Sequence, residues 1–297
     1  MQRKIRFKID GEELVIGQAP YFFDSIEGLS SSENEIESYT TINKDGSHIT
    51  GSNLSDRLVI VEGRIRGTDR QSAFHHRRRL ISLLNSKRGL GILEVEYSDG
   101  SKYYTETIVD GGVSIRESNL SETPANIFNF TVQFLCPNVY WKQEEVYITN
   151  FTKVIPAFEF EIDIDMEDDD DMKFGEVQHS PFGRIVNKGD CPSGFTCIVE
   201  EELTDYFCLT NINTGEFIKI NKPLQRGEKL FIYSHIGNKK IIHQDAQGRK
   251  TNWFKYMDLD STFFLLRPGN NDLKFTTNNE MDTVNVIIEH NNLYAGI

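Results

Sequence analysis

The chain of 297 residues has little cysteine and no long apolar run. None of its four cysteines forms a Cys-x-x-Cys pair, which argues against a zinc site of the usual spacing. No stretch approaches the roughly 18 apolar residues of a membrane helix, and the opening MQRKIRFKID lacks the apolar run of a secretory signal. We therefore expect no membrane insertion and no export, with the cysteines kept as thiols. They are Cys136, Cys191, Cys197 and Cys208.

Basic residues are also in deficit, with 32 Lys and Arg against 45 Asp and Glu, a formal net charge of -13. This charge opposes sequence-independent binding to nucleic acid or to an anionic bilayer. The charges are unevenly placed, because residues 64–88 are strongly basic and residues 159–171 contain acids and no base. Such opposed patches can meet within one chain or between identical chains.

Catalytic and cofactor motifs are missing as well. There is no G-x-S-x-G, H-E-x-x-H or phosphate-binding loop, so we expect no enzyme and no cofactor. The adjacent His75 and His76 cannot share one metal ion on a helix. The acidic run has ligands suited to calcium without the spacing of a calcium loop, which leaves cation binding there open. The run is Asp168, Asp169, Asp170 and Asp171.

The stretch FNFTVQFLCPNVYW, residues 128–141, predicts a seam between two domains. Its phenylalanines alternate with polar residues, as in a half-buried strand, and Pro137 ends the pattern. Cutting there gives domains of ordinary size, residues 1–138 and 139–297.

The first domain is predicted to be an antiparallel sheet or barrel with one helix. Asp10-Gly11 indicates a type I′ hairpin turn, and Thr68 or Asp69 can cap a helix at about residues 69–88. Strands are expected at 58–67, 92–97, 102–109, 113–116 and 128–135, with turns at Asp99-Gly100 and Gly111-Gly112. The helix carries apolar residues at helical spacing, namely Phe74, Leu80, Ile81 and Leu84. Its other face carries His75 and the candidate subunit-interface residues Arg77, Arg78 and Arg79.

Residues 24–56 are rich in Ser, Asn, Glu and Gly with isolated apolar residues. Such a segment is longer than the loops of about 12 to 15 residues that compact domains tolerate. Two interpretations stay open here, an arm that packs on a partner and a disordered loop.

The second half predicts a β-sandwich. Residues 157–166 alternate apolar residues with acids, which predicts a strand with one acidic face. From residue 183 onward, short strands recur between turn signals. They are expected at 184–187, 195–200, 206–211, 216–220, 229–233, 240–243, 261–266, 272–276 and 284–289.

Several segments together resemble the distal tail proteins (Dit) of long-tailed phages with non-contractile tails. They are VIVEGRIRGTDRQSAFHHRRRLISLLN, FLCPNVYW, IVNKGD, LTNINTGEFIKI, RGEKLFIYS and STFFLLRPGNNDLKF. The resemblance implies a structural hub in the virion tail tip, in which the first domain forms a homohexameric ring and the second is a galectin-like β-sandwich. It also implies three partners, namely the tail tube protein, a tail-associated hub or lysin protein, and receptor-binding proteins. Residues 24–56 would then clasp a neighbouring subunit.

The implied galectin-like fold leaves a second interpretation, a carbohydrate-binding module for cell-wall polysaccharide. The His-x-Asn-x-Arg strand of galectins does not occur, and Trp253 is followed by Phe254, Lys255 and Tyr256 rather than by the galectin pattern. Trp253 remains a candidate for stacking on a sugar ring, with a core or interface position as the alternative.

Overall fold

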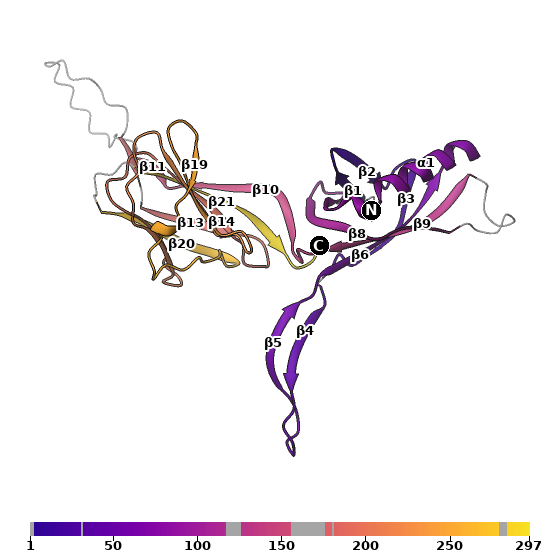
Figure 1. Ribbon diagram of the computed structural model, residues 1–297, viewed down its shortest axis with the longest axis horizontal. Helices are drawn as coiled ribbons and strands as arrows, with labels where there is room; N and C mark the ends of the chain where they lie inside the picture. The colour runs from indigo at the N-terminus through magenta and orange to yellow at the C-terminus, as the bar shows by residue number, and fades with distance from the viewer. Residues whose placement is uncertain (1–2, 31, 117–125, 156–175, 180, 279–283) are drawn as a thin grey trace, which may run out of the picture. The chain divides into compact units, whose positions relative to one another are not determined.

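The computed structural model describes residues 3–30, 32–116, 126–155, 176–179, 181–278 and 284–297. It divides into two compact units, unit 1 with Met1–Glu144 and Leu293–Ile297, and unit 2 with Glu145–Asn292. Both are built of antiparallel strands (Figure 1), so the mainly β class expected from the sequence is confirmed.

The division between the units differs from the expected cut after residue 138. Trp141 is fully buried in the core of unit 1, so the chain leaves that unit only after Glu144. The end of the chain also returns to unit 1, where the N–H of Ile297 donates to the carbonyl of Leu29 at 3.0 Å. Long-range packing therefore adds Leu293–Ile297 to unit 1.

Unit 1 holds the N-terminal strands and, among the described residues, the single α-helix. Its elements are β1 Lys4–Ile9, β2 Glu12–Ile16, β3 Tyr21–Glu27, β4 Asn34–Tyr39, β5 His48–Leu54, β6 Arg57–Arg66, α1 Arg70–Leu83, the 3₁₀ turn η1 Ser86–Arg88, β7 Gly91–Glu96, β8 Lys102–Arg116, β9 Ile127–Cys136 and the start of β10 Trp141–Asn150.

The long strand β8 belongs to two sheets of unit 1. Its first half pairs with β7 in the order β2-β1-β7-β8, and its second half pairs with β9 in the order β3-β6-β9-β8. Phe7 of β1 and Phe134 of β9 meet with ring centres 5.2 Å apart. The two sheets therefore enclose one core.

The expected turn at Gly111-Gly112 is wrong, because β8 runs through it without a break. The register between β8 and β9 shifts between Asp110 and Val113, which marks a β-bulge. Both glycines have positive φ, 67° and 80°, a conformation that suits a bulge as well as a turn. A Gly-Gly pair is compatible with a turn and with a bulge, and the pairing of β8 with β9 selects the bulge.

Other local predictions for unit 1 are confirmed. Asp10 and Gly11 take positive φ between β1 and β2, as a type I′ hairpin requires. The alternating residues of β9, from Phe128 to Phe134, are buried on one face. Asp69 caps α1, since its carboxylate accepts the N–H of Ser72 at 2.7 Å while the Ser72 hydroxyl accepts the N–H of Asp69 at 3.1 Å.

Helix α1 ends earlier than expected and buries only two of the four predicted apolar residues, Leu80 and Leu84. It stops at Leu83, and η1 covers residues 86–88. The side chains that enter the core are Ala73, Leu80, Leu83 and Leu84. Phe74 and Ile81, which share the helical spacing, lie beside this buried face and are exposed by 38% and 42%; the Phe74 ring packs edge-on against Phe128, with ring centres 5.1 Å apart. Unit 1 thus covers these two side chains only in part.

Unit 2 is a two-sheet β-sandwich, as the strand density predicted. One sheet has the order β13-β20-β15-β16 and the other contains β19-β18-β17-β14-β21, with one apolar core between them. The bounds are β11 Thr152–Ile155, β12 Glu176–His179, β13 Phe182–Asn187, β14 Phe195–Glu200, β15 Phe207–Asn211, β16 Phe217–Ile220, β17 Lys229–Tyr233, β18 Lys240–Gln244, β19 Lys250–Asn252, the 3₁₀ turn η2 Phe254–Tyr256, β20 Gly269–Thr277 and β21 Asn285–Tyr294.

One predicted strand of unit 2 is wrong, and one lies outside the described residues. Residues 261–266 form no strand, because only Leu266 makes a bridge, to Ser193, and the N–H of Thr262 donates instead to the carbonyl of Phe217 at 2.8 Å. The alternation there reflects burial of Phe264 and Leu266 without sheet pairing. The acidic strand at 157–166 and the run Asp168–Asp171 are outside the described residues.

Candidate interaction surfaces

The segment predicted as an arm contains a β-hairpin, formed by β4 and β5 and joined to the sheet of β3 and β6. The arm is shorter than the predicted 24–56, because residues 24–27 belong to β3 and pair with β6. Glu33 and Ser55 close its base, where the N–H of Ser55 donates to the Glu33 carbonyl at 3.0 Å. Figure 1 shows the hairpin extending away from the rest of unit 1.

The register of the hairpin sorts its side chains onto two faces. Cross-strand partners share a face, and residues alternate along each strand. The pairs Asn34–Leu54, Ile36–Ser52 and Ser38–Ile49 therefore place three aliphatic side chains together. The opposite face carries Glu35, Glu37, Tyr39 and His48, with the last two rings stacked at 5.2 Å.

The aliphatic side chains of this hairpin face solvent in the isolated chain. Ile36 is exposed by 56% and Ile49 by 68%, and Ile42 at the tip by 90%. A two-stranded hairpin is at best marginally stable in water, because it has no layer on which to bury its side chains. Exposed aliphatics on such an element mark it as an interaction surface.

The arginines predicted at a subunit interface lie on α1, with different surroundings. Arg77 is partly buried and lies over the rings of Phe74 and Phe128, at 5.8 and 5.5 Å from the ring centres. Arg78 and Arg79 are exposed. Phe74, Arg78 and Ile81 follow the spacing i, i+4, i+7 and therefore share one side of α1, where the Phe74 ring also contacts Phe128 of β9 with ring centres 5.1 Å apart. Helical spacing alone predicts that Phe74 and Ile81 are buried with Leu80, whereas only Leu80 is fully buried.

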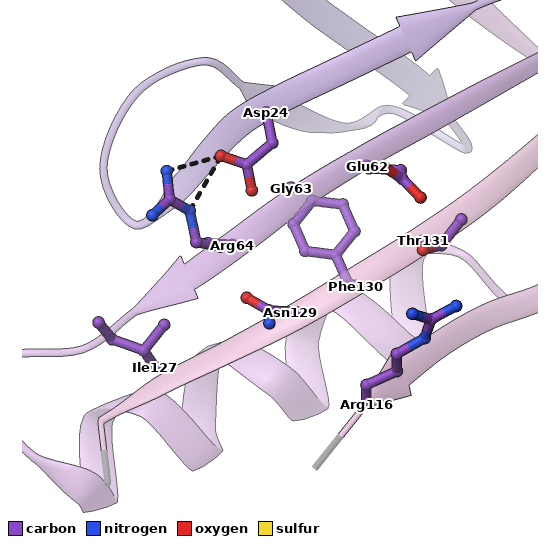
Figure 2. Close-up of a pocket in the computed structure, with 9 residues that line it drawn as sticks. All are labelled: Asp24, Glu62, Gly63, Arg64, Arg116, Ile127, Asn129, Phe130 and Thr131. Carbon is purple, nitrogen blue, oxygen red and sulfur yellow. Dashed lines mark hydrogen bonds and ion pairs between the residues drawn. The ribbon is translucent and has the colours of Figure 1, made fainter. Parts of the chain in front are cut away.

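A polar hollow of about 550 Å³ lies on the sheet of β3, β6 and β9 (Figure 2). The guanidinium of Arg64 binds Asp24 across the two strands at 2.6 Å, and the Ser25 hydroxyl donates to Glu62 at 2.9 Å. Gly63 is required beneath it, since a Cβ there would lie 2.7 Å from the ring of Phe130. The hollow was not predicted, because its walls come from strands far apart in the sequence.

The root of the hairpin is held by Arg57, the first residue of β6, which is 2% exposed. Its guanidinium donates to the backbone carbonyls of Gly28 at 2.8 Å and Val139 at 2.7 Å, and also to those of Leu29, Ser30 and Ala295. One side chain thus joins the chain before the hairpin, the segment after β9 and the C-terminal segment. No sequence pattern indicated this arrangement.

The candidate sugar-stacking residue Trp253 lies in the core of unit 2 and is 5% exposed. Its ring stacks on His243 at 4.0 Å with an interplanar angle of 7°, and Lys222 Nζ lies 4.6 Å from its centre. His243 also lies 3.1 Å from the carboxylate of Glu228. Trp253 also lines a hollow of about 600 Å³, and the imidazole of His243 covers one face of its ring.

Metal ligands do not gather in the part of the chain that the structure describes, where no three His, Cys, Asp or Glu side chains are grouped for an ion. Within those same residues, no helix is both long and apolar enough to cross a bilayer. The four cysteines, all among the described residues, form no disulfide; Cys136, Cys191 and Cys197 are buried, and burial raises the pKa of the Cys136 and Cys197 thiols.

Comparison with known structures shows the same fold over nearly the whole chain. The crystal structure of the Dit protein of phage SPP1, described as a hub adsorption apparatus in phages that infect Gram-positive bacteria, matches with a TM-score of 0.66 at 13% identity. The match covers 97% of this chain and 98% of that one. A chain of the phage P2 baseplate in its activated conformation with Ca matches with a TM-score of 0.52 at 10% identity, covering 98% of each chain.

Comparison with sequence families assigns each part of the chain in turn. A search of curated proteins finds no significant match. The family model for the phage tail protein RIFT-related domain matches residues 9–136, and the model for the siphovirus-type tail component, C-terminal domain, matches residues 188–294. Since the two models follow one another and together span most of the chain, it belongs to the distal tail (Dit) family of siphovirus-type phage tail components.

Proposed function

We propose that this chain is the structural hub of a phage tail tip, in which six copies form a ring that joins the tail tube to the tail-tip apparatus. The observation that carries the proposal is the ordered match of the two tail-component models, one to each half of the chain. The hub described for SPP1 Dit supports the same role, because the fold agrees from end to end. Catalysis is not part of it.

The ring is supported by surfaces of unit 1 that are open in a single copy. The hairpin exposes aliphatic side chains, and α1 exposes Phe74 and Ile81 beside arginines. A soluble chain rarely leaves two such apolar surfaces uncovered on one unit. Closed cyclic symmetry covers both at once if each copy offers one surface to each neighbour.

The partners follow from the position of a ring in a tail tip. We propose that one side of the ring meets the tail tube protein, the other a tail-associated hub or lysin protein, and that unit 2 carries receptor-binding proteins. Carbohydrate binding through Trp253 is not favoured, because its ring lies in the core against His243.

Light scattering with negative-stain images of the purified chain tests the ring. Six copies of the 34.1-kDa chain give a particle of about 205 kDa with a central hole. A protein that stays at 34.1 kDa up to high concentration contradicts the self-assembled ring. Labelling of purified virions with an antibody against the chain tests the location separately, since a hub at the tail tip is labelled at the tail end only.

A further inference from the structure

We propose that residues Leu293–Ile297 form a strap that fixes the root of the β4–β5 hairpin, and that strand β21 ties this strap to unit 2. We call residues Gly28–Ser30 and Ser55–Arg57 the hairpin root. The position of the hairpin on unit 1 is thus set by a segment more than 230 residues away in the sequence. The proposal concerns a single copy and goes beyond the proposed ring, because it needs neither a neighbour nor a tail protein.

The hairpin root lies between two ladders of paired strands. Strand β3 pairs with β6 as far as Glu27 and Ile60, and pairing within the hairpin begins at Asn34 and Leu54. A break between two ladders acts as a hinge, because the backbone dihedral angles there can change without loss of strand pairing. The orientation of the hairpin therefore depends on the contacts that hold its root.

The strap supplies such contacts. The N–H of Ile297 donates to the carbonyl of Leu29 at 3.0 Å, and the carbonyl of Ala295 accepts from the guanidinium of Arg57. The same guanidinium donates to the carbonyls of Gly28 at 2.8 Å and Leu29 at 3.3 Å. Leu29 is 6% exposed and belongs to the core of unit 1. Strap and hairpin root thus share one hydrogen-bond network, in which each buried carbonyl depends on its donor.

The strap is held on unit 1 by side chains that do not belong to the hairpin. The ring of Tyr294 lies edge-on to Tyr103, with ring centres 5.3 Å apart, and its hydroxyl donates to the side chain of Gln143 at 3.1 Å. Tyr103 and Gln143 are cross-strand partners on β8 and β10, so they present one face to the strap. Tyr294 and Ile297 also pack against the core of unit 1. The strap is therefore a fixed support for the hairpin root.

Strand β21 continues the strap into unit 2. It is one strand from Asn285 to Tyr294, and its residues Val286 and Ile288 are buried in the core of unit 2. A strand rises about 3.3 Å per residue, so a shift of β21 by one residue displaces Tyr294 by that step. A change in unit 2 that moves β21 thereby reaches the hairpin root through the chain itself.

Amide hydrogen exchange of the full chain, followed by mass spectrometry, tests the strap. The variant Tyr294→Ala removes the ring contact with Tyr103 and the hydrogen bond to Gln143. We expect exchange at the hairpin root to become roughly tenfold faster, because an aromatic contact and a hydrogen bond are lost beside it. Amides of β7, in the sheet of unit 1, should exchange as in the wild type.

The matched control is Tyr104→Ala. Tyr104 is partly buried like Tyr294 and follows Tyr103 on β8, but successive residues of a strand face opposite sides of the sheet. It should leave exchange at the hairpin root within about twofold of the wild type. All proteins are compared in the same oligomeric state, determined by light scattering, so a chain that forms no ring leaves this test unaffected.

Three outcomes overturn the strap. They are wild-type exchange at the hairpin root in Tyr294→Ala, equal acceleration there in Tyr104→Ala, and equal acceleration of the hairpin root and β7 in Tyr294→Ala. The last would show that Tyr294 stabilises unit 1 as a whole rather than the hairpin root.

An alanine inserted between Asn292 and Leu293 tests the tie to unit 2. It follows the last residue of unit 2 and shifts the strap by one residue, which turns its side chains to the other face. We expect exchange at the hairpin root to rise roughly tenfold here as well. An alanine inserted between Gly237 and Asn238, in an exposed turn of unit 2, is the control and should change nothing there. Wild-type exchange at the hairpin root after the first insertion would show that the strap docks independently of β21, and would overturn the tie.

Discussion

The guanidinium carbon of Arg57 lies 5.6 Å from the centre of the Trp141 ring, and both side chains are buried in unit 1. Each lies at a boundary predicted from the sequence. Arg57 directly follows the predicted arm of residues 24–56, and Trp141 lies near the predicted start of the second domain at residue 139. The pair instead joins these segments within one core. The cation lies against the aromatic face while its N–H groups bind backbone carbonyls, an arrangement favourable for a buried arginine.

We predict that Arg57→Ala lowers the free energy of unfolding of unit 1 by about 3–5 kcal/mol, because several buried carbonyls lose their donor. Trp141 fluorescence during urea unfolding reports on unit 1 when Trp253→Phe removes the other tryptophan. Arg66→Ala, an exposed position at the far end of β6, is the control and should change the free energy by less than about 0.5 kcal/mol. A loss below about 1 kcal/mol for Arg57→Ala would mean that water replaces the guanidinium.

We predict that Trp253→Ala lowers the free energy of unfolding of unit 2 by about 3–5 kcal/mol, since it removes a core indole and the stack on His243. Urea unfolding followed by circular dichroism and by Trp141 fluorescence separates the two units. Unit 1 should unfold as in the wild type. Unchanged stability of unit 2 together with weaker binding to host cell walls would instead support the sugar-stacking role.

We predict that unit 2 loses stability as the pH falls from about 6.5 towards 5, partly through His290. Burial lowers the pKa of His290 below its usual value of 6.5, although a hydrogen bond with the backbone of Val186 opposes the shift. In this range the unfolded chain binds more protons than the folded one, so protonation favours unfolding.

The variant His290→Phe keeps an aromatic ring against Tyr147, whose ring centre lies 5.4 Å away, and removes the titrating group. Urea midpoints of unit 2 at pH 7.5, 6.5, 5.5 and 5.0 should fall less steeply in the variant than in the wild type. Equal slopes in the two proteins would assign the pH dependence to other groups.

Local sequence signals predicted elements well where one short segment contains the whole cause. The Asp10-Gly11 turn depends on two residues that accept positive φ, and the cap of α1 depends on Asp69 and Ser72 within one turn. The alternation of β9 reflects a strand with one buried face. Each of these needs no knowledge of distant partners.

Sequence patterns gave wrong predictions where one pattern is compatible with two different structures. Gly111-Gly112 suits a turn and a bulge alike, and only the pairing of β8 with β9 selects the bulge. Residues 261–266 alternate without pairing, because the carbonyl of Phe217 takes up a backbone N–H that a strand would use. Burial patterns alone therefore overestimate the number of strands.

The amino-acid sequence by itself determined the mainly β class, the helix with its arginines and the resemblance to distal tail proteins, since these depend on periodicity and on the order of motifs. Only the tertiary structure decided that Phe74 and Ile81 stay exposed, that residues 34–54 form a hairpin, and that Arg57 joins three distant segments. Helical spacing shows which residues share a face, but not whether another element covers that face. Covering depends on contacts between residues far apart in the chain.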